Sequence, residues 1–271
     1  MGGLRNLDRR RFLRALGAVL AWPALGGIGL ARPAWAQGLL PESKEKGRDE
    51  DRFAFAQLRY RGGEWDPNPL AFRALLDEVT ARTSVEASSE RKILTPASKE
   101  VFSYPFLYQA GRDAFEPWSE EERDNLRTFL ENGGTLLADD SVGRVGAAFD
   151  AAFREEMRRM FPRQELRRLP SDHTVFRSFY LVRHVGGRRI VHPYLEGIQI
   201  GDVTPVVYCQ NDLGGAWEKD PAGNWVYPCE PGGEPQRREA FKLGVNIVLY
   251  ALTSNYKQDQ IHLPFIKRRV G

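Results

Sequence analysis

Cysteine, methionine and histidine are scarce in this chain. Its 271 residues include two cysteines, three methionines and four histidines. Two cysteines exclude a disulfide-rich scaffold and a four-cysteine zinc site. The sequence contains no internal repeat and no low-complexity tract. Its 42% hydrophobic and 28% charged residues also exclude a wholly disordered chain and a polytopic membrane protein.

The basic excess of the chain is small and lies at one end. Lys and Arg total 39 against 36 Asp and Glu, which gives a net charge of +3. Six of the arginines fall within residues 1–36, where Asp8 is the only acid. The remainder holds 33 basic and 35 acidic residues, a net charge of −2. Removal of this segment would leave no charge pattern typical of a nucleic-acid partner.

Residues 1–36 have the three parts of an export signal. A basic head, Arg9-Arg10-Arg11-Phe12-Leu13-Arg14, precedes an uncharged stretch over 15–31, and Ala34-Trp35-Ala36 follows. Paired arginines before Phe-Leu resemble the twin-arginine signal. We expect the export machinery of that pathway as a partner, cleavage after Ala36, and a periplasmic or extracellular protein without a stable membrane span. The alternative is an uncut anchor, but the apolar stretch is short and broken by glycines and Pro23.

The rest of the chain alternates between strand and helix patterns. We expect a linker over 37–52, one domain over 53–256 and a tail over 257–271. Strands are predicted at 53–60, 92–94, 104–108, 135–138 and 206–209, with Val85 as an alternative for the second, and helices at 70–80, 147–160 and 236–253. The region from Pro162 to about residue 200 has no regular pattern. Such alternation predicts an α/β fold, a mostly parallel sheet flanked by helices in a flavodoxin-like three-layer sandwich.

A further helix carries the clearest local signal in the chain. Ser119 is followed three residues later by Glu122, which makes a capping box available. Acids fill the first turn, where the helix dipole favours them, and Gly133 stops the helix.

Polar residues follow two of the predicted strands. Asp139 and Asp140 end one strand, and Asn211 and Asp212 follow another. Ligands of parallel sheets bind beyond the carboxyl ends of the strands, so these residues and the loop around Trp65 are candidates for one site. The two carboxylates suit a divalent cation or acid–base chemistry, or else helix capping and turn formation. Neighbours in a strand point to opposite faces, so we expect only one to face a site.

Asp172 and His173 form a second candidate. A histidine beside a carboxylate suits a general base or a metal ligand, and it also suits a purely structural hydrogen bond. Convergence with Asp139 or Asp140 and with Asp212 would favour a metal-assisted site.

Three smaller features bear on function. Cys209 and Cys229 are spaced for a disulfide, which we expect in an exported protein, although two free buried thiols are the alternative. Loop tryptophans suit either sugar stacking or packing over the sheet ends. They are Trp65, Trp118, Trp217 and Trp225. Asn246, in the apolar last helix, is expected to form internal hydrogen bonds.

Several separated motifs together resemble a known bacterial family. They are Gly62-Gly63-Glu64-Trp65, Tyr104-Pro105-Phe106-Leu107-Tyr108, the run from Leu126 to Asp140, Asp172-His173, and the run from Gly244 to Thr253. This family is a domain of unknown function, DUF4159, and the resemblance spans residues 53–253. It implies a distant likeness to class I glutamine amidotransferase domains. In those domains a helix, Gly-Gly and a short strand lead to the turn with the catalytic cysteine.

The same resemblance places that turn at Asp139-Asp140-Ser141, where no cysteine stands. Ser141 lacks the Gly-x-Ser-x-Gly elbow of serine nucleophiles. We therefore expect an exported binding or assembly module with an unidentified periplasmic protein or glycan as its partner. One alternative is a metal-assisted hydrolase that uses Asp140, Asp172 and His173. The other is a carbohydrate or cell-wall binder that uses the loop tryptophans.

Overall fold

The computed structural model describes the backbone of residues 52–267 and the side chains of residues 52–254. The expected export signal and all of the expected linker except Arg52 lie outside these residues. Among the described helices, none is long and apolar enough to cross a membrane.

One seven-stranded sheet forms the centre of the domain, in the order β2-β1-β3-β4-β7-β6-β5. The strands are β1 (Ala56–Leu58), β2 (Lys92–Leu94), β3 (Phe106–Gly111), β4 (Thr135–Asp140), β5 (Arg167–Arg168), β6 (Glu196–Ile200) and β7 (Val203–Cys209). Strands β2, β1, β3, β4 and β7 are parallel. Strands β6 and β5 add an antiparallel edge. The predicted mostly parallel sheet is confirmed.

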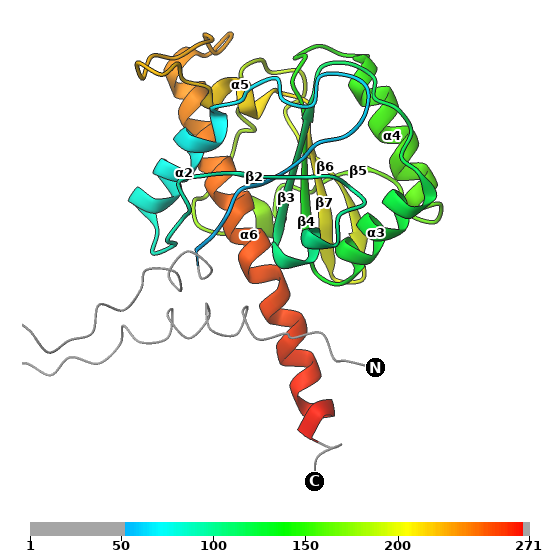
Figure 1. Ribbon diagram of the computed structural model, residues 1–271. Coiled ribbons are helices and arrows are strands. Elements are labelled where there is room, and N and C mark those ends of the chain that lie inside the picture. The colour runs from blue at the N-terminus through cyan, green and yellow to red at the C-terminus, as the bar shows by residue number, and fades with distance from the viewer. Residues whose placement is uncertain (1–51, 268–271) are drawn as a thin grey trace, which may run out of the picture.

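Helices cover both faces of the sheet (Figure 1). They are α2 (Ala71–Arg82), α3 (Glu120–Glu131), α4 (Ala148–Met160), α5 (Leu213–Trp217) and α6 (Gly233–Lys267), with single 3-10 turns η3 (Lys99–Ser103) and η4 (Thr174–Phe176). Helices α2, α5 and α6 lie on one face, and α3 and α4 lie on the other. This arrangement is the predicted three-layer α/β fold.

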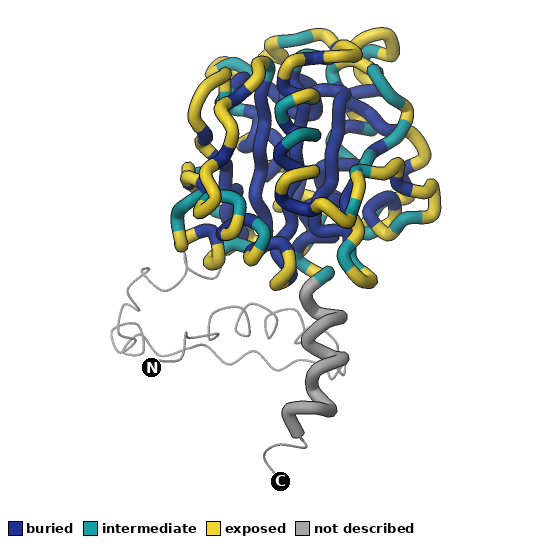
Figure 2. Tube along the Cα trace, turned by 90° about the vertical axis from the view of Figure 1, so that its right-hand side faces the viewer, coloured by how far each residue is buried: buried dark blue, intermediate teal, exposed yellow. Residues whose placement is uncertain are grey.

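Two apolar cores separate the three layers. On the α6 face, Trp217 packs with Phe55 and Leu75. On the α4 face, Phe129, Phe149 and other aromatic side chains fill the space below α3 and α4. The central strands β1, β3, β4 and β7 are therefore buried on both sides, and many exposed residues lie in the loops at the two ends of the sheet (Figure 2). Ligands of parallel sheets bind beyond the carboxyl ends of the strands, so the ends of the sheet are where a site is first expected.

The structure adds elements that the sequence pattern does not reveal. β5 consists of two exposed arginines at the sheet edge, and β6 has no clean alternation of buried and exposed residues. Neither segment carries the periodicity from which a strand is predicted. Helix α6 runs past its expected end at Thr253 to Lys267. Residues 257–267, which the sequence assigns to a tail, are therefore helical.

The capping box at the start of α3 is confirmed. Ser119 Oγ accepts a hydrogen bond from the Glu122 amide at 3.2 Å, and the Glu122 carboxylate accepts one from the Ser119 amide at 2.7 Å.

We expect Ser119→Ala to lower the free energy of unfolding by about 1 kcal/mol, because one amide of the first turn loses its acceptor. Urea unfolding followed by circular dichroism measures the change. Ser171→Ala, at an exposed turn serine, is the control and is expected to leave stability unchanged. Equal effects of the two substitutions would contradict the capping role.

Candidate functional site

Parallel pairing brings the candidate acids to one end of the sheet. Ala110 on β3 lies beside Asp139 on β4, and Asp139 lies beside Cys209 on β7. Asn211 and Asp212 follow β7 directly, so they reach the same carboxyl end. We call Asp139, Asp212 and the groups that bond them the carboxylate network.

Asp139 points to the α6 face and occupies the start of α5. Its Oδ1 accepts a hydrogen bond from the Leu213 amide at 2.9 Å. Its Oδ2 accepts from the Gly214 amide at 2.7 Å and from the Tyr108 hydroxyl at 2.8 Å. The free amides of a helix start favour an anion, and here the protein supplies that anion itself.

Asp212 is the N-cap residue of the same short helix, and its side chain caps the first turn. It is the one non-glycine residue of the described chain with a positive φ, at 54°. Its Oδ1 accepts from the Gly215 amide at 2.8 Å and from Asn68 Nδ2 at 3.1 Å, and Arg188 Nε donates to its Oδ2. Aspartate tolerates this left-handed conformation because its short side chain can bond the local backbone.

The two glycines of α5 allow the carboxylates to approach this closely. A Cβ at position 215 would stand 2.3 Å from Asp212 Oδ2. A Cβ at position 214 would stand 2.7 Å from the Tyr108 hydroxyl oxygen. A larger residue at position 215 would therefore displace the Asp212 carboxylate, and one at position 214 would displace the Tyr108 hydroxyl that bonds Asp139.

Burial sets the electrostatics of the network. It raises the pKa of Asp139 to about 7, with a further contribution from the nearby Asp212 charge. Burial also raises the pKa of Asp212, and Arg188 opposes that shift. The pair can therefore hold a proton near neutral pH. Both residues are fully buried and their oxygens are already bonded, so no substrate reaches them in this conformation.

Asp140 points to the opposite face, toward α4, as strand alternation predicts. Its Oδ1 accepts from the Val142 amide at 2.9 Å, and its buried Oδ2 has no hydrogen-bond partner among the described residues. Burial raises its pKa to about 7, and the charge of Asp150 contributes in the same direction. Asp150 itself accepts from the Tyr208 hydroxyl at 2.9 Å and from Arg154 Nε at 2.7 Å.

Asn211 acts within the fold. Its Oδ1 accepts from the amides of Val191 at 2.8 Å and His192 at 2.9 Å, and its Nδ2 donates to the His192 carbonyl at 2.8 Å. The side chain is fully buried. It fastens the loop before β6 to the end of β7, and no bonding capacity is left for a ligand.

Asp172 and His173 lie at the other end of the sheet. His173 Nε2 is 3.0 Å from Thr204 Oγ1, near the start of β7. Cys209, at the end of that strand, is five residues away, or about 16 Å. The structure therefore does not bring Asp172 and His173 to the carboxylates. Among residues 52–254, no three side chains of His, Cys, Asp or Glu are placed so that they could hold a metal ion together.

His173 is also occupied on both ring nitrogens. Nδ1 accepts from the Val175 amide at 3.1 Å, so in the neutral ring the proton lies on Nε2 and is donated to Thr204. Burial lowers the pKa of His173, which favours this neutral form. Neither nitrogen has a free lone pair, so the arrangement is that of a structural hydrogen bond.

The remaining sequence candidates take structural positions. Cys209 and Cys229 are free, buried thiols, so the expected disulfide is not formed in the structure. Trp118 and Trp217 are buried in the cores. Trp225 is covered by two cations, Arg237 at 4.2 Å and Lys219 at 4.4 Å from its ring centre.

Trp65 is half-buried, with Arg91 at 5.9 Å from its ring centre. Of the four candidate tryptophans, two are therefore buried and the other two have a cation beside the ring.

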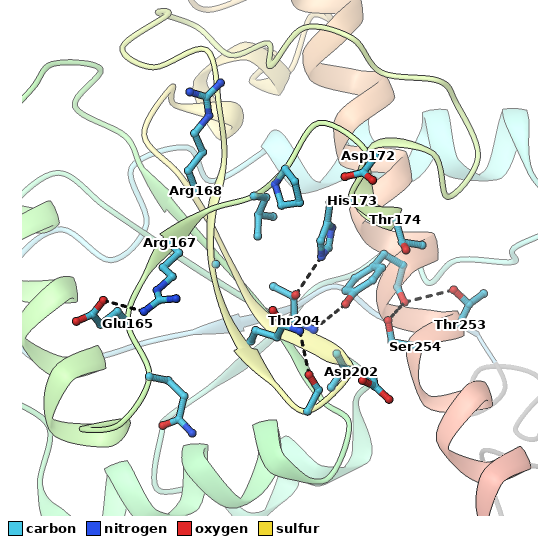
Figure 3. A pocket seen from close by; sticks show the side chains of 18 of the residues that line it. Glu165, Arg167, Arg168, Asp172, His173, Thr174, Asp202, Thr204, Thr253 and Ser254 are labelled. Atoms are coloured by element: carbon cyan, nitrogen blue, oxygen red, sulfur yellow. Dashed lines mark hydrogen bonds and ion pairs between the residues drawn. The ribbon is translucent and has the colours of Figure 1, made fainter.

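A cavity of about 690 Å³ opens at the amino end of the sheet, where β6 and β7 meet (Figure 3). Its wall includes β5, the His173–Thr204 pair and the α6 residues Thr253 and Ser254. Arg167 pairs with Glu165 at 3.4 Å. Four charged wall residues have no ion-pair partner among the described side chains. They are Arg163, Arg168, Asp172 and Asp202.

Sequence reasoning missed several members of the site. Tyr108, Asn68 and Arg188 lie in three distant segments, and only folding brings them to Asp139 and Asp212. The usable signal was the Gly214-Gly215 pair, which follows Asp212 after the single residue Leu213. An acid followed by glycines after a strand is typical of a turn that opens a helix.

We expect Asp140→Asn to reduce the pH dependence of stability, with the part due to Asp139 and Asp212 remaining. The pKa of Asp140 in the folded chain, about 7, lies above its ordinary 3.8. The folded chain therefore binds the proton more tightly, and stability falls as pH rises through this interval, by up to about 1.4 kcal/mol per pH unit. Urea unfolding at pH 5, 6, 7 and 8 measures the slope. Exposed Asp124→Asn should leave it unchanged, and an equal slope in both variants would refute the assignment.

We expect Arg188→Met to destabilise the fold by about 3 kcal/mol at pH 8, because Asp212 is left buried without its cation. The loss should be smaller at pH 5, where Asp212 takes up a proton more readily. The matched control is Arg189→Met, since this neighbouring arginine is half exposed and pairs with Glu230 at the surface. Thermal unfolding at both pH values compares the variants. A loss that does not depend on pH would contradict the charge-pairing role.

Comparison with known proteins agrees with the motif resemblance. No curated protein matches the chain. The model of one family, described as a domain of unknown function (DUF4159), matches residues 54–252. This match covers the sheet, both helical layers, the carboxylate network and most of the cavity wall. The chain belongs to the DUF4159 family.

Proposed function

We propose that this chain is an exported binding module without catalytic activity, built on an amidotransferase-like sheet. The observation that carries the proposal is the contrast between the two ends of the sheet. The carboxyl end, where parallel sheets usually bind substrates, is filled by the protein's own carboxylates. The amino end holds the open cavity.

Catalysis at the carboxyl end would need a reactive group and access to it. The position that the amidotransferase resemblance assigns to the nucleophile holds Asp139, Asp140 and Ser141, and all three are fully buried. Asp139 already accepts three hydrogen bonds, two of them from the amides at the start of α5. An anion of the protein thus occupies the donors that would stabilise a substrate's oxyanion.

Export is supported by the sequence alone. The twin-arginine pattern at Arg9-Arg10-Arg11-Phe12-Leu13 and the small residues ending at Ala36 favour cleavage and a periplasmic or extracellular location. In that compartment a binding module would meet cell-wall fragments, peptides and other exported proteins.

The cavity wall points to a class of ligand. Its arginines, Arg163, Arg167 and Arg168, are balanced by Glu165, Asp172 and Asp202. Balanced charge disfavours a polyanion such as a nucleotide. Unpaired charges of both signs suit a small zwitterion, such as a short peptide with a free amine and a free carboxylate. A volume of about 690 Å³ is typical of small-ligand sites.

The test is ligand-observed NMR with the full chain and four probes: trialanine, its N-acetylated amide, glucose and inorganic phosphate. We expect saturation transfer to trialanine and a clear loss with the blocked peptide, which carries neither charge. Asp172→Asn and Arg168→Gln should each weaken the trialanine signal. Asp220→Asn, at a partly exposed position between α5 and α6 that is not part of the cavity wall, is the matched control.

Three outcomes would reject the proposal. Failure of trialanine to bind, or binding that both cavity variants leave unchanged, would remove the cavity as a site for zwitterions. Conversion of any probe to a product, lost in Asp139→Asn, would contradict the absence of catalysis.

A further inference from the structure

We propose that the loop over residues 177–183 docks on an anionic lipid surface. This surface is separate from the cavity and from the carboxylate network. The proposal rests on the composition of the segment, on how the loop is held, and on which of its side chains are exposed.

The loop lies within a long segment without acids. Between Asp172 and Glu196 there is no aspartate or glutamate, but there are four arginines. Two of them are neutralised, Arg188 by Asp212 and Arg189 by Glu230. The other two, Arg177 and Arg183, have no ion-pair partner among the described residues, and both are exposed. Arg177 also donates a hydrogen bond to the Asp172 carbonyl, which carries no net charge. The loop therefore presents two positive charges that no described carboxylate neutralises.

The loop is closed at its base. The Val182 amide donates to the Phe176 carbonyl at 2.8 Å. Both side chains are buried in the core on the α6 face. The intervening residues thus leave the body of the protein and return to it at the same place.

Asn246 of α6 holds the inside of the loop, as the sequence predicted for this residue. Its Oδ1 accepts from the amides of Phe179 at 3.2 Å and Tyr180 at 2.7 Å. Its Nδ2 donates to the carbonyls of Val175 and Tyr180, both at 2.9 Å. One side chain therefore bonds four backbone groups of the segment and fixes its conformation.

The apolar side chains of this loop remain in solvent. Phe179 is 46% exposed and Leu181 is 67% exposed. Because the backbone is fixed, these side chains cannot fold back into the core beside them. Exposure alternates along the loop, with Arg177, Phe179, Leu181 and Arg183 exposed and Val182 buried. Two apolar side chains between two unpaired arginines form the surface.

An anionic bilayer matches both the apolar side chains and the positive charge of this surface. Phenylalanine and leucine side chains gain by burial below the headgroups, and arginines on either side bind lipid phosphates. An acidic protein would satisfy the arginines, but it would need a hydrophobic pocket to take up the two apolar side chains. The pattern of charge outside and apolar groups between favours the lipid surface, with weak and salt-sensitive binding.

The test measures the environment of a label within the loop, so it reports whether the loop itself enters the bilayer. Leu181→Cys is labelled with an environment-sensitive fluorophore in the full, folded chain. The native cysteines are buried, and the unsubstituted chain is the labelling blank. Vesicles of phosphatidylcholine alone are compared with vesicles that also contain phosphatidylglycerol. The control label is at Val145→Cys, which is 72% exposed in the loop between β4 and α4.

We expect a blue shift and a rise in emission at position 181 with the anionic vesicles, and quenching by brominated lipid. The shift should be smaller with the zwitterionic vesicles and absent at position 145. Arg183→Glu should reduce it, whereas Arg158→Glu on α4 should not. No shift at 181 with anionic vesicles, an equal shift at 145, or a shift insensitive to Arg183→Glu would overturn the proposal. The first of these results would leave an acidic protein as the partner of the loop.

Discussion

Burial of two carboxylates at one end of the sheet is the constraint on which the rest of the domain depends. Asp139 and Asp212 lie in a medium of low dielectric, where two nearby negative charges are unfavourable. The fold compensates with donors from separate places: the amides at the start of α5, the Tyr108 hydroxyl, Asn68 and Arg188. The network therefore ties β3, β4, β7, the loop before α2 and the loop before β6 to one point.

This constraint also decides where function can be sought. A parallel sheet offers its carboxyl end to ligands, because the loops diverge there and the helix starts supply donors. In this chain the donors are taken by internal acids, and Asn211 fastens the adjoining loop with its own side chain. Accessible polar groups remain at the opposite end, around the cavity, and along the 177–183 loop. Internal hydrogen bonds therefore occupy the polar groups at the carboxyl end of the sheet, whereas polar groups at the amino end remain accessible to a ligand.

Some elements of the fold follow from residues that are close together in the chain. The helix with the Ser119 capping box and the strands with continuous apolar runs were predicted, because local propensity and the buried environment agree there. β5 and β6 were not, since a two-residue edge strand of exposed arginines has no hydrophobic period. For the site, alternation correctly separated Asp139 from Asp140. No local pattern indicated that His173 would bond Thr204, far from both.

The sequence by itself determined the family, the α/β class, the internal role of Asn246 and the presence of acids at the carboxyl ends of β4 and β7. These properties depend on periodicity, on turn chemistry and on motifs that are local in the chain. Only the tertiary structure decided that the acids are sealed, that His173 lies at the opposite end of the sheet, and that an open cavity is found there. Sealing requires donors from segments up to 144 residues apart, such as Asn68 and Asp212. Their encounter is a property of packing, which no local pattern of residues encodes.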